Sequence, residues 1–159
     1  MKNCIVPYMS SPVFIGDIPM GGAHPIRLQS MTNTDTLDTS SSVAQCIKII
    51  EAGADYVRLT AQGAREASNL ENIKKELRKA GFRTPLIADI HFNPEAALIA
   101  ARLVEKIRIN PGNYADKRAS FIKVELDQKE YDEELERIHK RLLPLIGVCR
   151  QYGTVIRVG

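Results

Sequence analysis

The chain has 159 residues, of which 44% are hydrophobic and 26% charged, and its formal net charge is +3. This composition is typical of one soluble globular domain, so we expect neither a disordered protein nor a membrane protein. The mild charge argues against nucleic acid as a partner. The cysteines Cys4, Cys46 and Cys149 form no Cys-x-x-Cys pair, which predicts reduced thiols, and the N-terminus lacks a long apolar signal segment. We therefore expect a cytoplasmic location.

The N-terminal segment, residues 1–24, is predicted to contain a β-hairpin over 13–22. Its turn candidates are Gly16-Asp17 and Gly21-Gly22. A hairpin ahead of the first parallel strand would plug the bottom of a barrel. The alternative is an arm exposed to solvent.

The rest of the chain, residues 25–159, alternates strands with helices. Short β-branched runs predict strands at 26–30, 56–60, 85–91, 106–110 and 155–158. Helical spacing and end signals predict helices over 39–53, 69–81, 93–104 and from about residue 129 onward. The first helix has its N-cap candidates at 39–42, the third begins after Asn93, and Pro144 is expected to kink or divide the last. Strand-helix units of roughly 30 residues predict a right-handed βαβ series in an α/β fold with a parallel sheet.

Arginines recur near the ends of four strand runs: Arg27, Arg58, Arg108 and Arg157. The remaining strand run carries Asp89 and His91, which leave a strand on the same face because their spacing is two. If the strands are neighbours, these polar side chains converge on one site. Guanidinium groups donate planar pairs of hydrogen bonds that suit a diphosphate, although a single arginine at a strand end more often forms an ion pair.

The loop at 32–37 leaves two interpretations open. Asp35, with Thr32 and Asn33, is placed either to close over a ligand or to form a capped turn. His24 and His139 lie in settings that indicate no functional role.

Five sequence strings, in order along the chain, resemble one family. They are PIRLQSMTNTDT at 25–36, GADYVR at 53–58, ADIHF at 88–92, KIRINPGN at 106–113 and IRVG at 156–159. Together they are similar to the N-terminal barrel domain of the 4-hydroxy-3-methylbut-2-enyl diphosphate synthases. These are the iron-sulfur reductases of the methylerythritol phosphate route to isoprenoids. The stretch 114–145 further resembles the longer, three-domain form of that family.

The resemblance implies a (β/α)8 barrel of TIM type that binds 2-C-methyl-D-erythritol 2,4-cyclodiphosphate at its C-terminal face. The implied substrate-binding residues are Arg58, Asp89, His91, Arg108, Asn110 and Arg157, with Arg27 as a weaker match. The arginines matching the second, fourth and fifth strands would hold the diphosphate. The resemblance also implies a [4Fe-4S] cluster in a separate C-terminal domain, held by three Cys and one Glu, with flavodoxin or ferredoxin as the electron donor.

The sequence stops at Gly159, inside the motif of the fifth strand. We therefore expect about five of eight barrel strands, no metal site before Gly159 and no catalysis by this chain alone. Two open sheet edges would favour self-association, so we expect a homodimer. Two other interpretations stay open: another TIM-barrel enzyme with an anionic substrate, such as a pterin-binding synthase, and a folding module that binds no ligand.

Overall fold

The computed structural model describes residues 9–115 and 127–159. Its central feature is a parallel sheet of five strands, formed by β3 (Gln29–Met31), β4 (Tyr56–Thr60), β5 (Leu86–Asp89), β6 (Lys106–Ile109) and β7 (Val155–Val158). The strands lie side by side in chain order, β3-β4-β5-β6-β7. This arrangement is the open part of a TIM-type barrel, as the sequence predicts.

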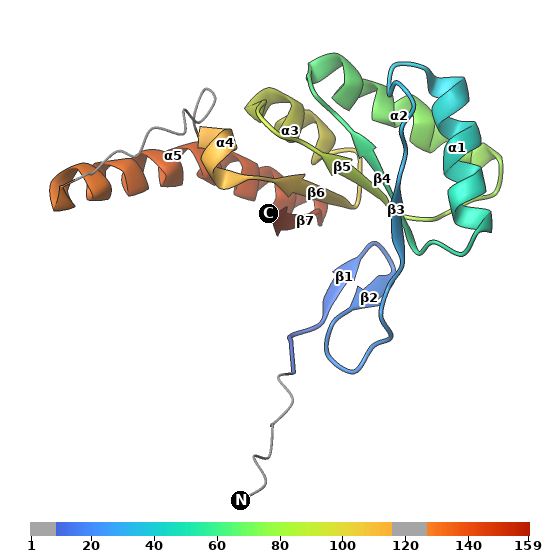
Figure 1. Ribbon diagram of the computed structural model, residues 1–159, viewed down its shortest axis with the longest axis horizontal. Coiled ribbons are helices and arrows are strands. Elements are labelled where there is room, and N and C mark those ends of the chain that lie inside the picture. The colour runs from blue at the N-terminus through green and yellow to red at the C-terminus, as the bar shows by residue number, and fades with distance from the viewer. Residues whose placement is uncertain (1–8, 116–126) are drawn as a thin grey trace, which may run out of the picture.

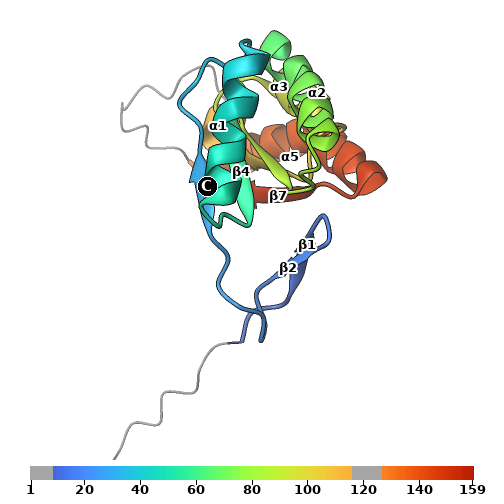
Figure 2. The same ribbon diagram turned by 90° about the vertical axis from the view of Figure 1, so that its right-hand side faces the viewer.

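Helices cover one face of this sheet (Figures 1 and 2). They are α1 (Thr39–Glu51), α2 (Ala64–Lys79), α3 (Pro94–Ala100), the short α4 (Pro111–Ala115) and α5 (Gln128–Tyr152). Strand residues such as Val57, Leu59, Ala88 and Ile107 are fully buried in one core with the apolar sides of these helices. Because strand side chains alternate, the residues between them point to the opposite face, which we call the inner face.

A second, smaller core lies on the inner face. The hairpin of β1 (Val13–Ile15) and β2 (Ile18–Met20) is antiparallel and turns at Gly16-Asp17. Its Ile15 is buried with Tyr56 and Ile87 of the sheet. The hairpin therefore packs against the inner face, where the sequence places a barrel plug.

Helix boundaries differ from the sequence prediction at three places. The N-cap of α1 is Asp38, not a residue at 39–42, because its carboxylate accepts hydrogen bonds from the Ser41 amide at 3.0 Å and the Ser41 hydroxyl at 2.6 Å. Helix α2 begins at Ala64, five residues before the predicted start, since small Ala67 supplies a buried position that hydrophobicity understates. Helix α3 ends at Ala100, and turns over 101–103 continue toward β6.

Helix α5 begins at Gln128, close to the predicted start near residue 129, but it continues through Pro144 to Tyr152 and is not divided there. Pro144 is exposed, and the buried Leu145 and Cys149 attach the following turns to the core. Gly153, with a φ of 69°, ends the helix in the left-handed conformation that suits glycine. Of the helices in the described ranges, none combines the length and apolar character that a membrane crossing needs.

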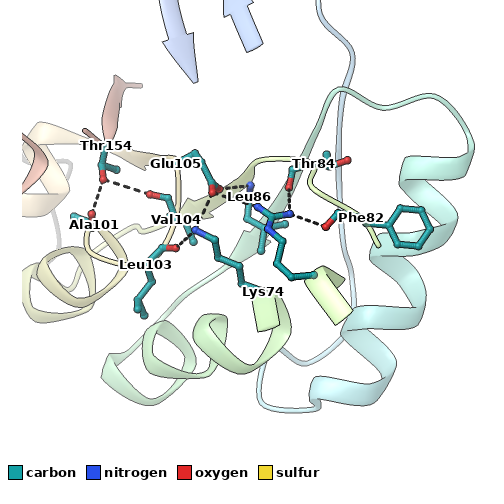
Figure 3. Close-up of polar contacts among 10 residues, drawn as sticks. Lys74, Phe82, Thr84, Leu86, Ala101, Leu103, Val104, Glu105 and Thr154 are labelled. Carbon is teal, nitrogen blue, oxygen red and sulfur yellow. Dashed lines mark hydrogen bonds and ion pairs between the residues drawn. The ribbon is translucent and has the colours of Figure 1, made fainter. Parts of the chain in front are cut away.

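A polar network fixes the amino ends of β5 and β6 (Figure 3). Glu105 accepts a hydrogen bond from the Leu86 amide at 2.8 Å and pairs with Lys74 at 2.8 Å and Arg78 at 3.4 Å. Nearby, the Thr154 hydroxyl donates to the Ala101 carbonyl at 2.5 Å. These contacts hold α2 and the loops before the strands. The network therefore lies at the amino ends of the strands, away from their carboxyl ends.

Candidate anion-binding site

The candidate site lies on the inner face at the carboxyl ends of β4, β5 and β6. In the sheet register, Asp89 of β5 lies between Thr60 of β4 and Arg108 of β6. Arg108 in turn lies opposite Arg157 of β7. Parallel strands in register thus bring polar side chains from four consecutive strands to one edge, as the spacing of the sequence motifs predicts.

Asp89 is the centre of the site. Its side chain is only 1% exposed, and its two carboxylate oxygens accept from different arginines. Arg58 Nη2 donates to Asp89 Oδ2, and Arg108 Nη1 lies 3.3 Å from Asp89 Oδ1. Arg108 Nη1 also lies 3.1 Å from Nε2 of His91. We call Arg58, Asp89, His91 and Arg108 the Asp89 cluster.

The Asp89 cluster has more donors than its carboxylate can accept. Each guanidinium carries five N–H groups, and Asp89 engages one nitrogen of each. Nε of Arg58 is buried with no hydrogen-bond partner among the described residues. Two positive charges share one negative charge, and both guanidiniums keep about a fifth of their side-chain surface exposed. The arrangement can therefore accept a further anion.

The other predicted site residues are placed differently. Arg157 is exposed on β7 beside Arg108 in the register, so it shares the edge of the cluster. The side-chain oxygen of Asn110 instead accepts from the Gly112 amide at 3.1 Å, which caps α4 where the sequence predicts only a turn.

Arg27 is not brought to the cluster. It lies before β3 rather than within a strand, donates to the Pro19 carbonyl at 2.9 Å, and pairs with Asp55 at 3.3 Å. These contacts tie the hairpin to the start of β4, a structural role that the sequence motif did not separate from substrate binding.

The loop at 32–37 is a capped turn held against α1. The Gln45 side chain accepts from the Asn33 amide at 3.0 Å and donates to the Asn33 side chain at 2.6 Å. Asp35 accepts from the Leu37 amide at 2.9 Å, and the Thr36 hydroxyl donates to the Thr60 carbonyl at 2.7 Å. Of the two interpretations that the sequence left open, these contacts support the capped turn.

Lys106 is a residue of the inner face that the sequence reasoning missed. It is 5% exposed, and its Nζ lies 5.9 Å from the centre of the Tyr56 ring. Burial, together with the nearby charges of Arg157 and Arg58, lowers the pKa of Lys106. Its position two residues before Arg108, which puts both on one face, was the available signal.

The described residues do not fit an iron-sulfur cluster. Cys46 and Cys149 lie in α1 and α5, both buried and free, and burial raises the pKa of Cys46 to about 11. Thiolates are the ligands that such clusters need. Across 9–115 and 127–159, no group of three or more His, Cys, Asp or Glu could hold a metal ion. Cys4 lies outside the described residues.

The parallel strands, the helices on their outer face and the cationic carboxyl edge together define the class: part of a TIM-barrel domain with a candidate anion site. Comparison with known families agrees, since a family model described as the GcpE TIM-barrel domain matches residues 10–159. The chain belongs to this family.

Curated relatives cover the same region. The chain is 57% identical over 150 residues to a protein of Parabacteroides distasonis named 4-hydroxy-3-methylbut-2-en-1-yl diphosphate synthase (flavodoxin). This match covers 94% of the chain and 24% of the relative. The chain is 47% identical to the protein of that name from Akkermansia muciniphila, with 98% and 27% covered. A chloroplastic rice protein, named as the ferredoxin form, is 46% identical, with 92% and 20% covered. The chain thus spans about a quarter of the length of these relatives.

Proposed function

We propose that this chain is the substrate-binding barrel part of a 4-hydroxy-3-methylbut-2-enyl diphosphate synthase, an oxidoreductase of the methylerythritol phosphate route to isoprenoids. The proposed ligand is 2-C-methyl-D-erythritol 2,4-cyclodiphosphate, bound through its diphosphate. The observation that carries the proposal is the Asp89 cluster, where two guanidiniums on one edge share a single carboxylate. Membership of the GcpE family supports the choice of this anion among others.

The cluster is prepared for a diphosphate before the ligand arrives. Asp89 holds Arg58 and Arg108 side by side, so less side-chain entropy is lost when they donate to phosphate oxygens. Each charge-assisted hydrogen bond contributes about 1.5 to 3 kcal/mol. Arg157, exposed on the neighbouring strand, adds a third guanidinium, and His91 is placed beside Arg108 at the rim.

The remaining parts of the reaction are assigned to residues outside this chain. We propose that the [4Fe-4S] cluster of the complete enzyme lies there, and that flavodoxin or ferredoxin is its electron donor, as the names of the relatives indicate for those proteins. On this proposal the chain alone binds substrate and does not turn it over. A cytoplasmic location stays a prediction, and the rice relative is named as chloroplastic.

A homodimer is a further part of the proposal. Strands β3 and β7 each have one neighbour in the described sheet, so each leaves a row of backbone groups at an open edge. Light scattering at micromolar concentration tests this expectation. A single monomeric species would contradict it.

Isothermal titration of the chain with the cyclodiphosphate tests the binding role. We expect saturable binding that Arg58→Ala and Arg108→Ala each weaken by about ten- to a hundredfold, the loss of one charge-assisted contact. The matched control is Arg65→Ala, an exposed arginine of α2. Binding of a pterin diphosphate in preference to the cyclodiphosphate would favour the pterin-binding alternative. Binding of neither ligand would favour a folding module.

A further inference from the structure

A hollow of about 440 Å³ lies on the inner face between the sheet and the hairpin. Met20 of the hairpin lines it on one side, and Tyr56 and Val155 line it on the other. Its charged lining residues are Arg27, Lys106 and Arg157, with no acidic side chain among the described residues that line it. The hollow therefore combines apolar walls with an excess of positive charge.

Lys106 is the unexplained group in this hollow. Arg27 is neutralised by Asp55 at 3.3 Å, whereas Lys106 is 5% exposed and, among the described residues, has a ring contact with Tyr56 but no ion pair or hydrogen bond. Its aromatic neighbour, Tyr56, offers a weak partner at 5.9 Å. The Lys106 ammonium is not among the fully enclosed polar atoms without a partner, so it reaches the open space of the hollow that it lines. An ammonium on a largely buried side chain is partly desolvated, and an anion in the hollow would offset that cost.

Arg157 connects the hollow to the Asp89 cluster. It lies opposite Arg108 in the register and also lines the hollow beside Lys106. Lys106 and Arg108 are two residues apart on one strand face, which separates their Cα atoms by about 6.6 Å. One anion with two charged groups can therefore contact Arg108 in the Asp89 cluster and Lys106 in the hollow at the same time.

We propose that Lys106, together with Arg157, forms a second phosphate subsite below the Asp89 cluster. The Asp89 cluster then holds one phosphate of a diphosphate, and the Lys106 ammonium holds the other. This inference rests on the proposed function, which assigns the ligand but gives Lys106 no part in binding it. The competing explanation is a carboxylate from another part of the protein that neutralises Lys106.

The test compares inorganic pyrophosphate with orthophosphate by isothermal titration of the chain. Lys106→Met should weaken pyrophosphate binding by about ten- to a hundredfold while changing orthophosphate binding little, because a single phosphate needs only the Asp89 cluster. Lys106→Arg keeps the charge and should retain the preference for pyrophosphate. Lys75→Met, at an exposed position of α2, is the matched control and should bind both anions as the unmodified chain does.

A pH series adds a readout that a purely structural role would not change. The charged and titratable groups that face Lys106 are Arg58 and Tyr56 of β4, Arg157 of β7 and Arg27 at the far side of the hollow. Because burial and the charges of Arg157 and Arg58 lower the pKa of Lys106, its positive charge is lost as pH rises toward the ordinary lysine value of about 10.4. Pyrophosphate affinity should fall over that range in the unmodified chain. The fall should be smaller in Lys106→Arg, whose charge does not titrate.

The outcomes separate the two proposals. If Arg108→Ala abolishes pyrophosphate binding and Lys106→Met leaves it unchanged, the second subsite is wrong and the proposed function stands. Absence of pyrophosphate and cyclodiphosphate binding by the unmodified chain would count against the proposed function itself. If Lys106→Met does not fold, as judged by circular dichroism, Lys106→Arg decides: a pH decline equal to that of the unmodified chain overturns the subsite.

Discussion

Asp89→Asn tests the Asp89 cluster most directly, because it removes the carboxylate charge that pairs with both Arg58 and Arg108 while keeping the size of the side chain. Removing one partner of a buried ion pair costs about 3 to 5 kcal/mol. Both guanidiniums keep about a fifth of their side-chain surface exposed, so water compensates part of the loss. We therefore expect the lower end of the range, a decrease of about 3 kcal/mol in the free energy of unfolding.

Urea denaturation followed by circular dichroism measures this decrease. With a slope of about 2 kcal/mol per molar urea, the unfolding midpoint should fall by about 1.5 M. Glu71→Gln, an exposed carboxylate of α2, should leave the midpoint within the error of the measurement. A loss below about 1 kcal/mol for Asp89→Asn would refute the reasoning, because it would match an exposed ion pair rather than a buried one.

Three further predictions follow from the same contacts. Gly159→Ala should weaken pyrophosphate binding several-fold with little change in stability. A Cβ at residue 159 would lie 2.9 Å from Nε of Arg108 and displace its guanidinium. Unchanged pyrophosphate affinity would contradict this. Unfolding stability should rise with pH between the lowered pKa of Lys106 and about 10.4, since the unfolded chain binds more protons there, and a rise that persists in Lys106→Met would count against it. Glu105→Ala should cost about 2 to 3 kcal/mol by urea denaturation, because it leaves the Leu86 amide without its acceptor, yet pyrophosphate affinity should stay the same.

The sequence predicts most of the sheet because its strands are apolar on a buried face. The strands at 56–60 and 155–158 match β4 and β7 residue for residue. The first strand was placed too early, at 26–30, because Ile26 and Leu28 read as buried strand residues although they are 93% and 60% exposed. Hydrophobic residues identify a strand when they are also buried, and the hydrophobic residues just before β3 are exposed.

The sequence predicted those parts of the site that depend on the alternation of side chains along a strand. Two-residue spacing brought Asp89 and His91 to the same arginine, Arg108, although β5 ends at Asp89 and His91 lies beyond the strand. Register brought Arg58 to Asp89 from the neighbouring strand. This alternation could not reveal that Arg27 lies outside the strand, because its ion-pair partner, Asp55, is distant in sequence. Lys106 was overlooked for a different reason: lysines are rarely buried without a partner, so the sequence prior favours an exposed one.

The stability predictions for Asp89 and Lys106 have opposite signs, although both residues lie on the same face. Replacing Asp89 removes negative charge from a surface with excess positive charge, so the fold should weaken. Replacing Lys106 by methionine removes a largely buried charge that has no ion pair among the described residues, so the fold should gain stability below the lowered pKa while pyrophosphate affinity falls. A lysine kept for packing alone would lose both together. Stability gained as affinity is lost would therefore separate a binding role for Lys106 from a structural one.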